Sequence, residues 1–178
     1  FIPPQDMRHL RVMTRYRRKL AGYLAGEKNR MHEVPEDSGC KVSCVVSDMS
    51  GVTATEMISA LMEGGRSPEE IAVKASVRLR KTAAEEIALA LDGRMSDRHR
   101  FVLARIRRHM RWLEQQTAEI DGQVERALQP YKRQMVLLQT IPGIDAVSAG
   151  MLLAELGTDM SRFGSKERLS SWVGMCHG

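Results

Sequence analysis

The chain has 178 residues, with 27 Lys and Arg against 22 Asp and Glu, which gives a formal net charge of +5. This length is enough for one domain or two small ones, and it excludes a mini-protein that depends on disulfides. Aromatic residues make up 4% of the chain and there are 12 methionines, a composition unusual for a β-sandwich and ordinary for packed helices. We therefore expect a mainly α fold. No run of about 18 apolar residues is present, so we expect a cytoplasmic protein with no membrane partner.

A first helix is predicted over residues 5–32, before Pro35 breaks the helical pattern. One side of this helix is apolar, and another carries arginines at helical spacing: Arg8, Arg11, Arg15 and Arg18. Arginine makes planar, bidentate contacts with phosphates, so these side chains are candidates for binding the backbone of DNA or RNA. A basic face that only meets solvent is the alternative.

Three further helices are predicted from their first residues. Two capping-box patterns predict helices over residues 53–62 and 68–91. A serine at position 96 caps a longer helix over residues 97–129. The helix over residues 68–91 is the expected antiparallel partner of this long helix, and the two would form a long helical hairpin or coiled coil.

The long predicted helix carries apolar residues spaced alternately by four and three, interrupted by Thr117, which is typical of a coiled-coil seam. The seam consists of Leu103, Ile106, Met110, Leu113, Ile120 and Val124. It predicts a homodimer or a higher oligomer formed through this helix. Packing within the chain alone is the alternative.

The same helix carries a second cluster of arginines, which are further candidates for contacts to nucleic acid: Arg98, Arg105, Arg108 and Arg111. An alternative function belongs to another class of protein. The chain would then be a non-catalytic dimerisation module without nucleic-acid binding of its own, and these arginines would pair with acidic residues of a second copy: Glu114, Glu119 and Glu125.

The segment around Pro142 and Gly143 resembles a helix-hairpin-helix element. In such an element the N–H groups of Gly143 and Ile144 would contact a phosphate without recognising base sequence. Asp145 stands where the usual hairpin has a second glycine. Its carboxylate would cap the following helix but would repel a phosphate, so a purely structural hairpin is the alternative.

Residues 138–178 resemble the signature block of one family, the DEDD transposases of the bridge-RNA-guided insertion sequences. The start of the chain, residues 1–30, resembles the segment that follows the last acidic cluster of that family's catalytic domain. Asp145 and His177 depart from the family's Gly and Pro. The matching residues are Ile141, Pro142, Gly143, Ile144, Ala149, Leu153, Ala154, Glu155, Gly157, Arg162, Phe163, Leu169, Ser171, Trp172 and Gly174.

The resemblance implies that the chain is part of an insertion-sequence transposase, an enzyme that catalyses DNA transposition by site-specific recombination. Its implied partners are DNA and a structured guide RNA. In that family a RuvC-like domain binds a divalent metal, Mg²⁺, through four acidic residues, and a C-terminal domain supplies a nucleophilic serine. The matching motifs would lie before Phe1 and after Gly178, so we expect no catalytic residue, no metal site and no cofactor within this chain.

The resemblance also divides the chain into three expected parts. Residues 1–66 would be a basic helix and the tail of an upstream RuvC-like domain. Residues 67–130 would be the helical hairpin or coiled coil, and residues 131–178 the start of the transposase domain with its helix-hairpin-helix element.

Overall fold

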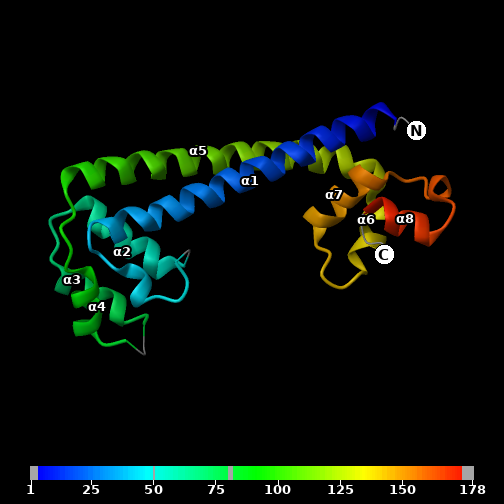
Figure 1. Cartoon of the computed structure of the whole chain (residues 1–178). Helices are drawn as coiled ribbons and strands as arrows, with labels where there is room; N and C mark the ends of the chain where they lie inside the picture. Colours follow the sequence, from blue (N-terminus) through cyan, green and yellow to red (C-terminus); the bar gives the residue numbers. More distant parts are fainter. Residues whose placement is uncertain (1–3, 50, 80–81, 174–178) are drawn as a thin grey trace. The chain divides into compact units, whose positions relative to one another are not determined.

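The structure is a computed structural model that describes residues 4–49, 51–79 and 82–173 (Figure 1). The described residues form helices and turns and include no β-strand, which confirms the predicted mainly α fold. None of the helices in these ranges is both long and apolar enough to span a lipid bilayer. Short 3-10 helices lie at Val42–Cys44, Gln129–Tyr131 and Ser161–Phe163. The α-helices are α1 (Gln5–Asp37), α2 (Val52–Glu63), α3 (Pro68–Ser76), α4 (Ala84–Leu91), α5 (Asp97–Leu128), α6 (Lys132–Gln139), α7 (Ala146–Leu156) and α8 (Lys166–Val173).

The chain folds as two compact units. The terminal unit combines Phe1–Leu20 with Thr117–Gly178, and the central unit is Ala21–Gln116. The boundary between the units falls within α1 and α5, so each unit contains one part of each of these two long helices.

Three predicted helices are confirmed with small shifts at their ends. The helix over residues 53–62 is α2, and the helix over residues 97–129 is α5. The helix over residues 5–32 is α1, which continues past the expected break at Pro35 as far as Asp37.

The predicted helix over residues 68–91 is wrong, because the chain divides it into α3 and α4. Its predicted start is confirmed: the Ser67 hydroxyl accepts the N–H of Glu70 at 3.3 Å, and the Glu70 carboxylate accepts the N–H of Ser67 at 3.1 Å. The break after α3 lets α4 fold back and bury Ile87 and Leu91, which are 0% and 1% exposed. Burying these two side chains stabilises the fold by several kcal/mol. This gain exceeds the helix propensity that is lost at the few residues where the helix is interrupted.

The core of the central unit lies among α2, α3, α4 and the parts of α1 and α5 that belong to this unit. Its buried side chains include Met31, Met57, Ile58, Ile71, Ile87, Leu103 and Ile106. Backbone hydrogen bonds join the loop after α1 to the end of α4. The N–H of Lys41 donates to the carbonyl of Ala90 at 2.7 Å, and the N–H of Arg94 donates to that of Ser38 at 2.8 Å.

In the central unit, α1 is the antiparallel neighbour of α5, so the predicted partner over residues 68–91 is wrong (Figure 1). The Glu27 carboxylate of α1 lies 3.2 Å from His109 Nδ1 of α5. Ten residues further along α1, the Asp37 carboxylate lies 3.5 Å from His99 Nε2, ten residues earlier in α5. Residue numbers rise along α1 while those of the contacting residues fall along α5, so the two helices run antiparallel.

The predicted coiled-coil seam packs within the chain. Leu103, Ile106 and Leu113 are 0%, 7% and 1% exposed, and Met110 packs against the core of the central unit. Val124 packs in the core of the terminal unit, and Ile120 is half-buried. Leu103, Ile106 and Leu113 are therefore not available to a second copy, and the structure supports the alternative of packing within the chain for these three residues.

In the terminal unit, the start of α1 also runs antiparallel to the end of α5. Arg17 Nε donates to the Asp121 carboxylate at 2.7 Å, and the Tyr131 hydroxyl donates to the Asp6 carboxylate. The second hydrogen bond lowers the pKa of Asp6 and raises the pKa of Tyr131, because it stabilises the charged carboxylate and the protonated hydroxyl.

The core of the terminal unit is formed by α1, α5 and α7. Met7 and Leu10 of α1 and Ala154 of α7 are buried together, and Leu128 packs against them. A Cβ on Gly150 would lie 3.0 Å from the Leu128 side chain, so α7 approaches α5 closely at this glycine. These contacts connect α7 to the first residues of the chain.

Candidate nucleic-acid interface

One face of α5 in the central unit carries a stripe of exposed residues. Leu103 and Ile106 point into the core. Since an α-helix turns by about 100° per residue, the opposite face holds five residues spaced alternately by three and four. All five are exposed, and we call them the outer stripe: Arg98, Phe101, Arg105, Arg108 and Trp112.

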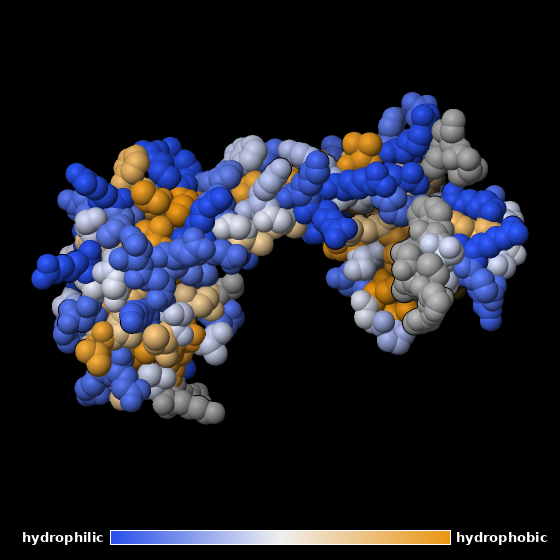
Figure 2. Space-filling view, in the orientation of Figure 1, coloured by the Kyte–Doolittle hydropathy of each residue, from blue (hydrophilic) through white to orange (hydrophobic). Residues whose placement is uncertain are grey.

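No carboxylate of the described residues neutralises the positive charge of the arginines in the outer stripe. In the described part of the chain, Arg98, Arg105 and Arg108 form no salt bridge, and neither does the exposed Arg111 at the edge of the stripe. Arg100 differs, because its Nε donates to the Leu61 carbonyl at 3.3 Å and its Nη1 to Asp97 at 3.1 Å. Hydrophilic side chains, blue in Figure 2, predominate on the visible surface of the helices. The four predicted arginines of α5 are thus free to meet an anion.

The aromatic side chains of the outer stripe are large and held in place. Phe101 is 59% exposed, and the Arg105 guanidinium lies over its ring, 4.7 Å from the ring centroid. Trp112 is 49% exposed and stacks on His109, with 5.9 Å between ring centroids and 23° between ring planes. The stripe therefore alternates cationic and aromatic groups.

A buried carboxylate supports the position of Trp112. Glu27 is 7% exposed, and its Oε1 lies 3.2 Å from His109 Nδ1. The same oxygen accepts a hydrogen bond from Arg30 Nη1 at 2.5 Å. His109 thus connects the exposed tryptophan to an ion pair whose carboxylate is buried, which restrains the histidine ring on which the tryptophan stacks.

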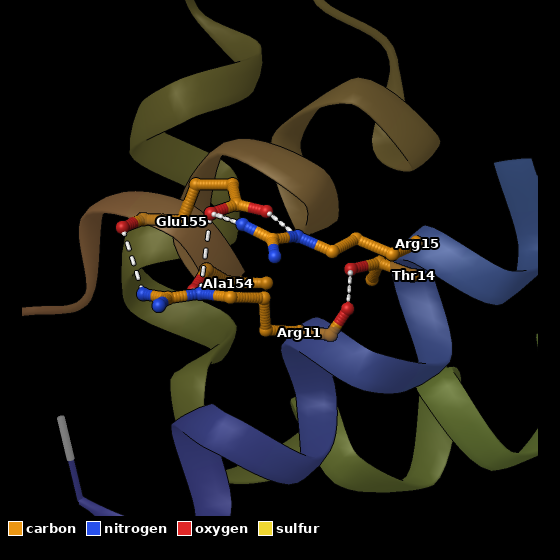
Figure 3. A network of polar contacts seen from close by, with 5 residues as sticks. All are labelled: Arg11, Thr14, Arg15, Ala154 and Glu155. Atoms are coloured by element: carbon orange, nitrogen blue, oxygen red, sulfur yellow. Dashed lines mark hydrogen bonds and ion pairs between the residues drawn. The ribbon is translucent and has the colours of Figure 1, made fainter.

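The predicted arginine row of α1 has two kinds of member. Arg8 and Arg18 are exposed and form no salt bridge within the described ranges. Arg15 binds the Glu155 carboxylate of α7 in a bidentate pair, with distances of 2.7 and 2.9 Å (Figure 3). The hydrogen bond with Glu155 raises the pKa of Arg15 above its ordinary value.

Arg11 binds the C-terminal end of α7. Its Nε donates to the Ala154 carbonyl and its Nη2 to the Glu155 carbonyl, each at 3.1 Å, and its Nε also lies 3.2 Å from the Glu155 carboxylate (Figure 3). A cation at the C-terminus of a helix satisfies free carbonyls and interacts favourably with the helix dipole. In the terminal unit, Arg11 and Arg15 therefore hold α7 against α1, and both guanidinium groups already bind the same carboxylate.

Replacing Glu155 with glutamine should lower the free energy of unfolding by about 1 kcal/mol, because the substitution keeps the size of the side chain but removes the charge shared by Arg11 and Arg15. Urea denaturation followed by circular dichroism measures this change. The matched control is Glu125→Gln, since Glu125 is exposed and forms no salt bridge with any described residue. Equal stability of the two variants would show that the network contributes nothing.

The turn between α6 and α7 holds the predicted phosphate contacts, Gly143 and Ile144. Gly143 has φ +85°, a left-handed conformation that favours glycine. The N–H of Ile144 donates to the Ile141 carbonyl at 3.1 Å, so this geometry leaves it no free donor for a phosphate. Asp145 caps α7 by accepting the N–H of Ser148 at 2.8 Å, which lowers the pKa of its carboxyl. These contacts favour a structural role for the turn.

The described residues do not fit a metal centre, because they contain no group of three or more His, Cys, Asp or Glu that could hold an ion. The central unit does contain an apolar cavity of about 110 Å³, lined by four methionines and bordered by Lys28 and Arg107. His32 faces this cavity, and its buried Nδ1 has no hydrogen-bond partner in the described structure. Burial lowers the pKa of His32.

The sequence analysis did not identify the roles of three residues at these sites: Phe101, Trp112 and Glu155. It did not assign roles to Phe101 and Trp112, although their spacing from the arginines by three and four residues was visible in the sequence. It also treated Glu155 as a residue of a family signature, whereas the structure shows this carboxylate binding two arginines of α1.

Comparison with known proteins gives one match. Residues 135–178, which include most of α6 together with α7 and α8, match the model described as the transposase IS116/IS110/IS902 family. No match was found among curated proteins or among solved structures. The match supports a transposase of the IS116/IS110/IS902 family.

Proposed function

We propose that the chain is part of an insertion-sequence transposase and that it binds nucleic acid during DNA transposition by site-specific recombination, directed by a structured guide RNA. The family match over residues 135–178 supports the transposase role and implies DNA as a partner. The resemblance of the sequence to the bridge-RNA-guided transposases supports the guide RNA.

The exposed arginines of α5 carry the proposal for nucleic-acid binding. Arg98, Arg105, Arg108 and Arg111 lie within four turns of one helix and have no acidic partner among the described residues. Repulsion between uncompensated like charges is unfavourable in the free protein, and a phosphate backbone relieves it by taking up the guanidinium groups. Such contacts give affinity without recognising base sequence.

We assign no catalytic role to a residue of this chain. The family's Mg²⁺ requires a cluster of carboxylates, and the described residues provide none. We propose that the parent enzyme's metal site lies in its RuvC-like domain and its nucleophilic serine in its C-terminal domain, as the resemblance implies.

Replacing Arg98, Arg105, Arg108 and Arg111 with glutamine should weaken binding to a structured RNA and to duplex DNA alike. Each lost phosphate contact lowers the slope of log affinity against log salt by about 0.7 to 0.9, so the slope should fall by about 3 in the quadruple variant. Fluorescence anisotropy across a salt series measures both quantities.

The matched control removes the same charge elsewhere, by replacing four exposed basic residues with glutamine: Lys41, Lys74, Lys132 and Arg133. The control should keep most of the salt slope. Light scattering on the same samples tests the alternative function, a dimerisation module. If the arginine variant loses dimerisation and keeps its full affinity for nucleic acid, the proposed function is wrong for this cluster.

A further inference from the structure

We propose that the outer stripe of α5 binds an unpaired stretch of nucleic acid, with bases stacked on Phe101 and Trp112 and phosphates bound by Arg98, Arg105 and Arg108. This inference rests on the proposed function and deepens it, since it names the strand geometry that the site accepts.

The spacing of the outer stripe fits a single strand. Phe101 and Trp112 lie on the same face of α5, eleven residues apart, which corresponds to about 16 Å along the helix axis. Arg105 and Arg108 lie between the two aromatic residues, and Arg98 lies one turn before the first. Unpaired nucleotides present both phosphates and free base faces, whereas the bases of a duplex are already stacked on one another.

The exposure of the two aromatic rings supports stacking. Phe101 and Trp112 are 59% and 49% exposed although burying either ring within the chain would be favourable. His109 stacks on one side of Trp112 and is fixed by Glu27, so the tryptophan ring is restrained before a base arrives. Restraining a side chain in advance reduces the entropy that binding costs.

The charge of the outer stripe favours a polyanion over a second copy of the chain. The stripe contains three arginines and no acidic residue. In a two-fold symmetric dimer centred on this stripe, the same patch of both copies would meet, which would bring two positively charged surfaces together. Phosphates complement the same surface, and the guanidinium planes can also stack on bases.

Tryptophan fluorescence provides the direct test. The chain contains two tryptophans, so the Trp172→Phe variant leaves Trp112 as the single reporter. Adding a single-stranded oligouridine should quench its emission, and adding a duplex RNA of the same length should leave it nearly unchanged. The double variant Phe101→Leu/Trp112→Leu should lose affinity for the single strand by about tenfold or more and affinity for the duplex by less than about threefold.

The matched control is Tyr23→Leu, since Tyr23 is an aromatic residue of the same unit that is 59% exposed but lies on α1. It should bind both RNAs as the unchanged chain does, and circular dichroism confirms that each variant is folded. The inference would be overturned if the single strand left the emission of Trp112 unchanged, or if the double variant lost as much affinity for the duplex as for the single strand. Neither result would affect the salt-series test of the four arginines, which decides the proposed function separately. A dimer that disappears in the double variant, with unchanged RNA binding, would assign the stripe to contact between copies and also overturn the inference.

Discussion

Replacing Leu103 with alanine should lower the free energy of unfolding by about 2 to 5 kcal/mol. Leu103 is 0% exposed and lies in the core of the central unit with Met31, Ile58 and Ile106. The substitution removes apolar contacts and leaves a cavity that a close-packed core fills only in part. Urea denaturation followed by circular dichroism measures the loss.

The neighbouring Val102 provides the control, because it is 44% exposed on the same helix. Val102→Ala should change the free energy of unfolding by no more than about 0.5 kcal/mol. The pair of variants also tests the original prediction of a dimer seam. A Leu103→Ala chain that unfolds like the unchanged protein but has lost an oligomer would show that this leucine serves contact between copies.

Replacing Gly93 with alanine should destabilise the chain by about 1 to 3 kcal/mol. A Cβ at this position would lie 2.6 Å from both the backbone nitrogen and the Sγ of Cys40, and 2.7 Å from the carbonyl carbon of Gly39. Two of these three atoms belong to the backbone, so a side-chain rotation cannot relieve the overlap. The loop after α1 would have to move away from the end of α4, at the expense of the hydrogen bond from Arg94 to Ser38.

Gly122→Ala is the matched control for this prediction. Gly122 lies inside α5, and a Cβ there would have no atom within 4 Å. Alanine favours a helix over glycine, so this variant should become more stable by about 0.5 to 1 kcal/mol. Thermal unfolding of the two variants should therefore shift in opposite directions. A Gly93→Ala variant as stable as Gly122→Ala would show that the approach to Cys40 is not close in solution.

Local signals in the sequence predicted most of the helices but not how they pair. The capping box at Ser67 and the helix predicted over residues 97–129 both depend on nearby residues, and both are confirmed in the structure. The break between α3 and α4 contains no Gly or Pro in its described residues, so no local signal predicts it. It arises because Ile87 and Leu91 are buried in a core whose other residues lie far away in the sequence. The packing of α5 against α1 also depends on residues far apart in the sequence. A periodic apolar stripe shows which residues share a face of a helix, and it does not show which other helix covers that face.

The two arginine rows illustrate the same limit for function. By spacing and charge, Arg11 and Arg15 were as good candidates for phosphate binding as Arg105 and Arg108. The structure separates them, because Glu155, which binds both Arg11 and Arg15, lies 140 residues from Arg15 in the sequence. A sequence alone does not show whether a positive charge already has its partner within the fold.

The terminal unit is assembled from two segments that flank the central unit in the sequence, which sets an order for folding during synthesis. Arg11 and Arg15 leave the ribosome long before Glu155 has been made, so the contacts between residues 5–20 and α7 form only after α7 has been made. The central unit is contiguous and can fold meanwhile. Before the central unit folds, residues 21–116 are a long flexible loop between the two segments of the terminal unit. Folding of the central unit shortens this loop, which reduces the entropy lost when the two segments meet. The central unit would thus act as an internal folding aid for the part of the chain that carries the transposase signature.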